Sequence, residues 1–281
     1  MPPAVVARPD RVYLYDDPAA ATLDVGVLSE HVRETLGLRC SVRKEFFAYH
    51  IRGETEDLAR RIAATKVRSI GRRWEPFDPV YGEVQFERRL LEDPVKRAPG
   101  ILYDGFRMMR LCGELLPQRE RTLRIVHVAF TSRMFGTFGE DGRYHGRVNV
   151  CGYPSLISTV GIVEAPAKPK EYYLLKRRLT APDGVVPFEA AKAPFAGKFV
   201  DYDDPRLTAV MKGYVLQGLF HHLTGEAFCD NPRCCLFNAH WQAEVLEAQL
   251  GSGRLCRRHA AVAARIAERR EAPSRRSPSA R

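Results

Sequence analysis

The stretch FHHLTGEAFCDNPRCCLFNAHW, residues 220–241, decides how the chain folds. It follows a run of apolar residues that predicts a helix ending near Gly225. Asp204 suits the N-cap of that helix, and Pro205 suits its first position. The apolar residues cover more than half of the helix circumference, so we expect a central, buried helix. They are Leu207, Val210, Met211, Tyr214, Leu219, Phe220 and Leu223.

Two close-spaced pairs of metal-binding residue types follow the helix. Cys229 and Cys234 have four residues between them, including a turn-forming Asn-Pro, whereas Cys256 and His259 have two. Each pair can supply two corners of a tetrahedron of sulfur and imidazole ligands. The spacing therefore predicts one zinc ion bound by these four residues. Four protein ligands leave no position for water, so this zinc would be structural and would not catalyse.

Other residues compete for the predicted site. Cys235 and His240 are the rival ligands, and the cysteines could also be ordinary buried thiols beside a surface histidine. Because Cys235 directly follows Cys234, we expect it to point away from the same metal and to pack as a small apolar residue. Four of the seven cysteines lie between 229 and 256, which favours metal ligands over a disulfide framework.

Further from this stretch, the spacing of apolar residues predicts an α/β fold. We expect strands at 11–15, 40–51 and 123–131, with one or two more within 145–163. We expect helices at 25–36, 53–67, 103–116 and 169–179, and connecting structure with room for one helix at 74–100. His127 falls inside a predicted strand, where a half-buried strand residue explains it without a functional role.

Composition and charge limit the classes of function. With 281 residues, 45% of them hydrophobic, the chain can bury a core without disulfides. It shows neither a signal-peptide pattern nor a membrane-spanning apolar run, so we expect a cytoplasmic protein with no membrane partner. Nine arginines and two glutamates between 254 and 281 give that segment +7 of the net charge of +10. Such a tail binds polyanions weakly and without sequence preference.

The cysteine segment resembles that of the archaemetzincins, a family of zinc peptidases. FCDNPRCCL (228–236) and LCRRH (255–259) are similar to the family pattern, in which H-E-x-x-H-x-x-G-x-x-H runs into C-x4-C-x-M and then C-x2-C. Anchored on Cys229, the first motif begins at Gly218, and only His222 and Gly225 match it. Gly218 and Phe228 replace two zinc histidines, and Leu219 replaces the general-base glutamate. Leu236 and His259 stand at the methionine and the last cysteine, and NAHWQAEVLEAQ (238–249) resembles an uncharacterised group distantly related to archaemetzincins.

The resemblance implies a zincin fold like that of the metzincins: α/β (α+β), with a mixed sheet, a long central helix and a zinc-braced helical subdomain at the C-terminal end. We expect a flexible segment 1–10, a metallopeptidase-like α/β domain 11–228, the zinc-braced subdomain 229–271 and a disordered basic tail 272–281. The resemblance also implies that Gly218 and His222, one helical turn apart, line a cleft in which Phe228 closes the third ligand position.

Loss of two histidines and the glutamate argues against a catalytic zinc at this place. The preferred interpretation is a metallopeptidase-like binding or regulatory protein whose unknown partner is a peptide or protein, with His222 a buried histidine bonded to the backbone. An active metallohydrolase is the alternative and requires a rearranged metal site. Its candidate ligands are His221, His222, Glu226 and His240. A third hypothesis is a zinc-stabilised nucleic-acid-binding protein, suggested by the arginine tail.

Overall fold

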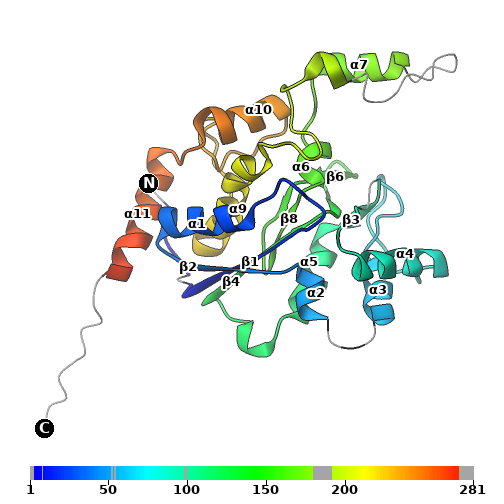
Figure 1. The fold of residues 1–281 in the computed structure, drawn as a ribbon, viewed down its shortest axis with the longest axis horizontal. Helices are drawn as coiled ribbons and strands as arrows, with labels where there is room; N and C mark the ends of the chain where they lie inside the picture. Colours follow the sequence, from blue (N-terminus) through cyan, green and yellow to red (C-terminus); the bar gives the residue numbers. More distant parts are fainter. Residues whose placement is uncertain are drawn as a thin grey trace, which may run out of the picture.

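A mixed sheet of five strands, in the order β2-β1-β4-β8-β7, lies at the centre of the molecule (Figure 1). Its strands are β1 (Arg11–Tyr15), β2 (Arg39–Arg43), β4 (Ile125–Thr131), β7 (Asn149–Val150) and β8 (Ser155–Ser158). The first four in this order run parallel, and β7 pairs antiparallel with β8 at one edge. The computed structural model describes residues 3–7, 9–51, 53, 55–97, 100–179 and 192–271.

A second sheet of three strands has the order β3-β5-β6. Its strands are β3 (Leu102–Asp104), β5 (Met134–Phe138) and β6 (Tyr144–Arg147). After β6 the chain passes through the single residue Val148 into β7. Residues 144–150 therefore connect the edges of the two sheets without a loop.

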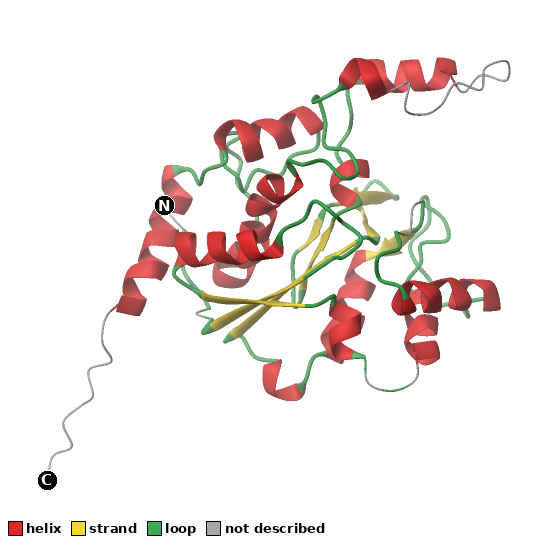
Figure 2. Ribbon diagram, viewed as in Figure 1, coloured by secondary structure: helices red, strands yellow, loops and turns green. Residues whose placement is uncertain are grey.

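Helices cover both faces of the large sheet (Figure 2). On one face α1 (Val25–Leu36) contacts both α9 (Leu207–Thr224) and α11 (Arg257–Glu271), and α2 (Phe46–His50) and α5 (Gly105–Leu115) pack on the other. α3 (Thr55–Ala63) packs against α4 (Tyr81–Glu92) beside the small sheet. The remaining elements are α6 (Gly161–Glu164), α7 (Lys170–Leu179), α10 (Gln242–Leu246), the 3-10 helices η1 (Gln118–Glu120) and η2 (Ala193–Phe195), and the π-helix η3 (Glu247–Ser252).

The larger hydrophobic core lies between the sheet and α9. Fourteen of the 18 residues of α9 are buried, so the expectation of a central, buried helix is confirmed. Cys229, Cys234 and Leu236 belong to the same core as Val128 of β4. The predicted subdomain 229–271 therefore shares its core with the α/β domain.

The predicted α/β class is confirmed, and several elements occur where the pattern of apolar residues placed them. Strand 11–15 and helix 25–36 have the predicted bounds. The bounds of helix 25–36 are set by its caps. Asp24 Oδ1 accepts a hydrogen bond from the Val27 N–H at 3.0 Å, and Gly37 ends the helix with φ 64°.

Three predicted elements differ from the structure. The strand expected at 40–51 ends at Arg43, because the Glu45 carboxylate accepts a hydrogen bond from the Ala48 N–H at 2.7 Å and caps α2. Asp204 is not the N-cap of α9: its carboxylate accepts from the Arg206 N–H at 2.9 Å in a turn, and the helix begins at Leu207. Segment 145–163 holds most of β6, all of β7 and β8, and most of α6, not one or two strands.

The N-terminal segment expected to be flexible is attached to the body where it is described. The N–H groups of Val6 and Ala7 donate to the Leu223 carbonyl at 2.7 and 3.3 Å, and Arg265 donates to the Pro3 carbonyl. The tail 272–281 lies outside the described residues. Of the helices that the structure describes, none combines the length and apolar character required to cross a bilayer.

A buried carboxylate connects α4 to the small sheet and to the turn between β4 and β5. Glu87 is fully buried, with one oxygen 2.9 Å from Lys66 Nζ and 2.8 Å from the Tyr103 hydroxyl. Its other oxygen accepts from Arg133 Nη2 at 3.2 Å. Lys66 and Arg133 are themselves buried, so Glu87 provides the negative charge that two buried cations need.

A second buried network surrounds the hydroxyl of Tyr15. This oxygen lies 2.8 Å from His50 Nε2 and 2.9 Å from His127 Nδ1, and it accepts from Arg43 at 2.8 Å. Arg43 also makes a two-point contact with Glu120 at 2.7 and 3.0 Å. His127, expected to be half-buried, is fully buried, and burial lowers its pKa to about 4.

We expect His127 to make the fold acid-sensitive. Its pKa in the folded chain lies below the ordinary value of about 6.5, so the unfolded chain binds the proton first as the pH falls between these values. The free energy of unfolding therefore decreases as the pH falls through this window, by about 2 kcal/mol at pH 5. Urea unfolding at pH 7.5 and 5.0 measures the loss, which should be smaller by about this amount in His127→Phe.

Comparing the natural chain with His127→Phe cancels the contributions of other titrating groups to the loss of stability. Burial raises the pKa of Asp17 to about 6, which acts in the opposite direction, but equally in the natural chain and in the variant. Equal losses of stability in both proteins would show that His127 is not the responsible group.

Candidate metal centre and cleft

The structure brings the four predicted ligands together at the junction of the Cys229 loop and α11. The ligand atoms of Cys229, Cys234, Cys256 and His259 all lie within 4.8 Å of one another. Cys229 Sγ is 3.9 Å from Cys256 Sγ, and His259 Nδ1 is 3.8 Å from Cys234 Sγ and 3.2 Å from Cys256 Sγ. Three of the residues are buried and Cys256 is partly buried.

The three individual distances are close to the edges of a zinc tetrahedron. Zn–S bonds of about 2.3 Å and Zn–N bonds of about 2.0 Å place two sulfurs about 3.8 Å apart, and a sulfur and a nitrogen about 3.5 Å apart. Three thiolates and one imidazole are also a donor set that zinc prefers. The chemistry and the spacing of the four side chains therefore fit zinc.

The local backbone holds the sulfur atoms in place. The loop from Cys229 closes through a hydrogen bond from the Cys229 N–H to the Leu236 carbonyl at 3.0 Å. Backbone N–H groups of Asn231 and Cys256 donate to the sulfurs of Cys229 and Cys234, each at 3.4 Å. Such N–H donors stabilise and orient metal-bound thiolates.

The imidazole of His259 is fixed by packing. His259 lies in the first turn of α11, and its ring sits edge-on to the ring of Phe220 in α9, with centroids 5.4 Å apart. Because Nδ1 faces the thiols, Nε2 carries the proton of the neutral ring when Nδ1 binds a metal. The site is therefore built directly against the central helix.

The two rival ligands lie outside this group. The Cys235 N–H donates to the Arg254 carbonyl at 2.9 Å, and the Cys235 carbonyl accepts from Gln249 Nε2 at 2.9 Å. A Cβ atom at Gly213 of α9 would lie 2.5 Å from that carbonyl, so glycine permits the close contact between α9 and the cysteine loop. The other rival, His240, is exposed and lines a separate cleft.

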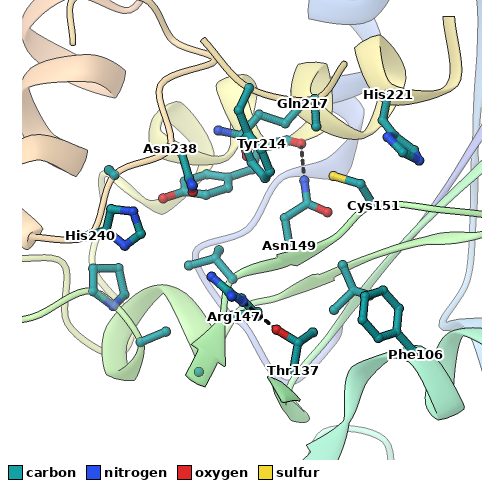
Figure 3. A pocket seen from close by; sticks show the side chains of 18 of the residues that line it. Phe106, Thr137, Arg147, Asn149, Cys151, Tyr214, Gln217, His221, Asn238 and His240 are labelled. Carbon is teal, nitrogen blue, oxygen red and sulfur yellow. Dashed lines mark hydrogen bonds between the residues drawn. The ribbon is translucent and has the colours of Figure 1, made fainter. Parts of the chain in front are cut away.

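This cleft has a volume of about 560 Å³ and lies along α9 (Figure 3). The helix contributes Tyr214, Gln217 and His221, and residues 146–151 of the segment that joins the two sheets contribute a wall. The other lining residues come from neighbouring loops, from α5 and from β5. They are Phe106, Thr137, Ala165, Pro166, Gly225, Ala227, Phe228, Asn238, Ala239 and His240.

The expectation that Gly218 and His222 line the cleft is wrong. A Cβ atom at Gly218 would lie 3.1 Å from Ser155 Cβ, so this position faces β8. His222 is buried, and its Nε2 donates to the Leu123 carbonyl at 2.8 Å. Burial lowers the pKa of His222, which favours the neutral ring. The cleft face of α9 is instead one residue earlier, at Gln217 and His221.

The other candidates for a rearranged catalytic site do not converge. Glu226 is exposed and forms an ion pair with Arg258 at 2.7 Å. His221 and His240 lie at opposite ends of the cleft in Figure 3. Among the residues described, the three cysteines and His259 form the only group of metal-ligating side chains close enough to hold an ion.

Several polar residues of the cleft were missed from the sequence. Arg147, Asn149 and Cys151 lie on alternate positions of the 144–151 segment, and all three line the cleft. No local signal in the sequence marks them, because the intervening residues Gly146, Val148 and Val150 line the cleft as well. Burial raises the pKa of Cys151 to about 12, so its thiol stays protonated at neutral pH and is a poor nucleophile.

Comparison with known proteins gives a family and one structural likeness. No curated protein matches the chain. A crystal structure of a zinc-dependent peptidase from Methanocorpusculum labreanum (strain Z) is similar with a TM-score of 0.45 and 12% identity, over 90% of this chain and 98% of that chain. A family model matches residues 8–266, nearly the whole length. The chain therefore belongs to the Probable metallopeptidase family (DUF6775).

Proposed function

We propose that this chain is a member of its metallopeptidase family that keeps a structural zinc site and has lost the catalytic one, and that its cleft binds a peptide without cleaving it. One observation carries the proposal: the cleft face of α9 presents Gln217 and His221, and so offers a single imidazole. None of the described residues that line the cleft is an aspartate or a glutamate.

A peptidase zinc centre needs more than this face provides. Catalytic zinc is held by three protein ligands, with a fourth position for water, and a nearby carboxylate takes the proton from that water. Gln217 stands one helical turn from His221 where a second ligand would be needed, and a neutral amide binds zinc poorly. The cleft therefore lacks both the zinc ligands and the base that zinc-dependent peptide hydrolysis requires.

The role assigned to the Cys3His group is structural. Its four ligand atoms lie close together, and three of the four residues are buried. A metal ion bound by all four would have no open coordination position for substrate. The C-x4-C spacing after the central helix also supports a place in a distant branch related to the archaemetzincins. None of the seven cysteines forms a disulfide, which agrees with zinc ligation by three of them and supports a reducing, cytoplasmic location.

We expect the purified protein to contain one zinc per chain and to show no zinc-dependent peptidase activity. Metal analysis and cleavage of a fluorogenic peptide library with added zinc measure the two quantities. His221→Ala should leave the background rate unchanged, because the lone imidazole supports no metal. His222→Ala should cost about 1 kcal/mol or more of stability through the lost bond to Leu123, also without effect on the rate.

Two results would contradict the proposal. Cleavage that requires zinc and disappears in His221→Ala would demonstrate a rearranged catalytic site on the cleft face of α9. A second equivalent of tightly bound zinc, lost in the same variant, would lead to the same conclusion.

A further inference from the structure

The cleft contains the guanidinium of Arg147, whose two Nη atoms have no partner among the described residues. Arg147, at the end of β6, donates from Nε to Thr137 Oγ1 of β5 at 2.8 Å, and this bond holds the side chain across the strand pair (Figure 3). No described residue accepts a hydrogen bond from its two terminal nitrogens or forms an ion pair with it. The residue is half-buried and lines the cleft. A guanidinium held at Nε, with both Nη atoms unpaired, can donate one hydrogen bond to each oxygen of a carboxylate.

The charges around this guanidinium point to an anionic ligand. The ionisable side chains that can carry positive charge in the described lining are Arg147, His221 and His240, and no carboxylate balances them. The guanidinium of Arg147 gives the cleft a positive charge. Its other walls are apolar or neutral, so this charge is weakly screened once a ligand excludes water.

Two buried amides in the wall of the same cleft are each held by one hydrogen bond. Asn149 Nδ2 donates to the Tyr214 carbonyl at 3.0 Å, and Gln217 Nε2 donates to the Phe237 carbonyl at 3.1 Å. The carbonyl oxygens of both amides are buried and have no hydrogen-bond partner. Both residues are more than nine-tenths buried. Each oxygen exposes less than 1 Å², so the two amides hold residues 149 and 237 against α9 and fix the shape of the cleft wall.

We infer that the cleft selects a peptide that carries a carboxylate, and that Arg147 binds this carboxylate through its two Nη atoms. The carboxylate is the C-terminus of the peptide or an acidic side chain. This inference rests on the proposed function, because it names the chemistry of the peptide that the same cleft binds. Loss of this two-point contact should weaken peptide binding about 10- to 100-fold.

The test uses the zinc-loaded full chain and two libraries of dodecapeptides randomised at every position, one with a free C-terminal carboxylate and one with a C-terminal amide. Peptides retained by the immobilised protein are sequenced by mass spectrometry, and their affinities are measured by fluorescence polarisation. We expect retained peptides to be enriched in free C-termini, or in Asp and Glu at one position. The two libraries separate these sources of the carboxylate.

Matched variants show whether Arg147 is responsible. Arg147→Gln should lose the preference and bind the best peptides about 10- to 100-fold more weakly, and Arg147→Lys should recover only part of it, since a lysine cannot make the two-point contact. Arg143→Gln is the control, because Arg143 belongs to the same β5–β6 hairpin but is exposed and paired with Asp141 at 2.7 Å.

The outcomes separate the inference from the function on which it rests. If neither library binds, both are wrong. If peptides bind without a preference for carboxylates, or if Arg147→Gln keeps that preference and affinity, the inference is wrong and the peptide-binding function stands.

Discussion

Cys229→Ser should lose its zinc and much of its stability, and this is the largest effect that we expect from a single substitution. The serine oxygen is a poor zinc ligand, and the remaining three donors would hold the ion far more weakly. Structural zinc contributes on the order of 10 kcal/mol to the folding of compact zinc modules. The loss should act on the loop after α9 and on α11, since these elements meet at the four ligands.

Metal content, thermal unfolding and limited proteolysis measure this result. The natural chain should bind one zinc per molecule, whereas Cys229→Ser should bind none tightly, melt at much lower temperature and be cut by protease after α9. Cys235→Ser is the matched control, because Cys235 is buried in the same loop but lies outside the ligand group. It should keep its zinc. A Cys229→Ser protein with full metal content and an unchanged melting curve would show that the ligand assignment is wrong.

The second large effect concerns Glu87. Glu87→Ala leaves the buried cations Lys66 and Arg133 without their shared carboxylate and removes the acceptor of the Tyr103 hydroxyl. Removal of one partner from a buried ion pair costs about 3–5 kcal/mol, because the remaining charge stays away from water. Urea unfolding of both proteins at pH 7.5 gives the difference in free energy.

Glu92→Ala is the control for this substitution. Glu92 lies on the same helix and pairs with Arg88 at 3.6 Å, but both side chains are exposed. An exposed pair of this kind contributes about 0–1 kcal/mol, so Glu92→Ala should be close to neutral. Similar losses in the two variants would indicate that Glu87 stabilises α4 locally and that the buried charges matter little.

Elements governed by local signals were predictable from the sequence. The bounds of α1 follow from Asp24 and Gly37, and the end of α9 follows from Gly225, which adopts φ 79°. The metal-ligand group was predictable for the same reason, since its spacing within two short segments restricts the geometry. That the four residues bind zinc remains a prediction.

The orientation of α9 was not predictable, because the helix is buried on nearly every side and its apolar pattern therefore identifies no face. Whether His221 or His222 faces the cleft depends on non-local contacts of Gly213 with the Cys235 carbonyl and of Gly218 with Ser155. The resemblance to a peptidase motif placed the cleft face one residue too late.

Buried charges also escaped prediction. Glu87 and Arg133 have the residue types of a solvated surface, and contacts between distant positions, such as their own pairing across 46 positions, allow them to be buried. The weak periodicity of 74–100 reflects this, since Gln85 and Glu87 are buried polar residues on α4. Arg147 was overlooked for a similar reason: its role depends on which wall of the cleft the short β6–β7 segment forms.

The loop between α9 and α10 gives the metal centre and the cleft a common support. It begins with the ligands Cys229 and Cys234 and ends with the cleft residues Asn238 and His240, and the Phe237 carbonyl between them accepts the bond from Gln217. An ion that orders the first half of this loop lowers the entropy that a peptide must remove from the second half. If zinc strengthens peptide binding in this way, thermodynamic reciprocity requires that a peptide bound in the cleft raise the affinity of the four residues for zinc by the same coupling free energy.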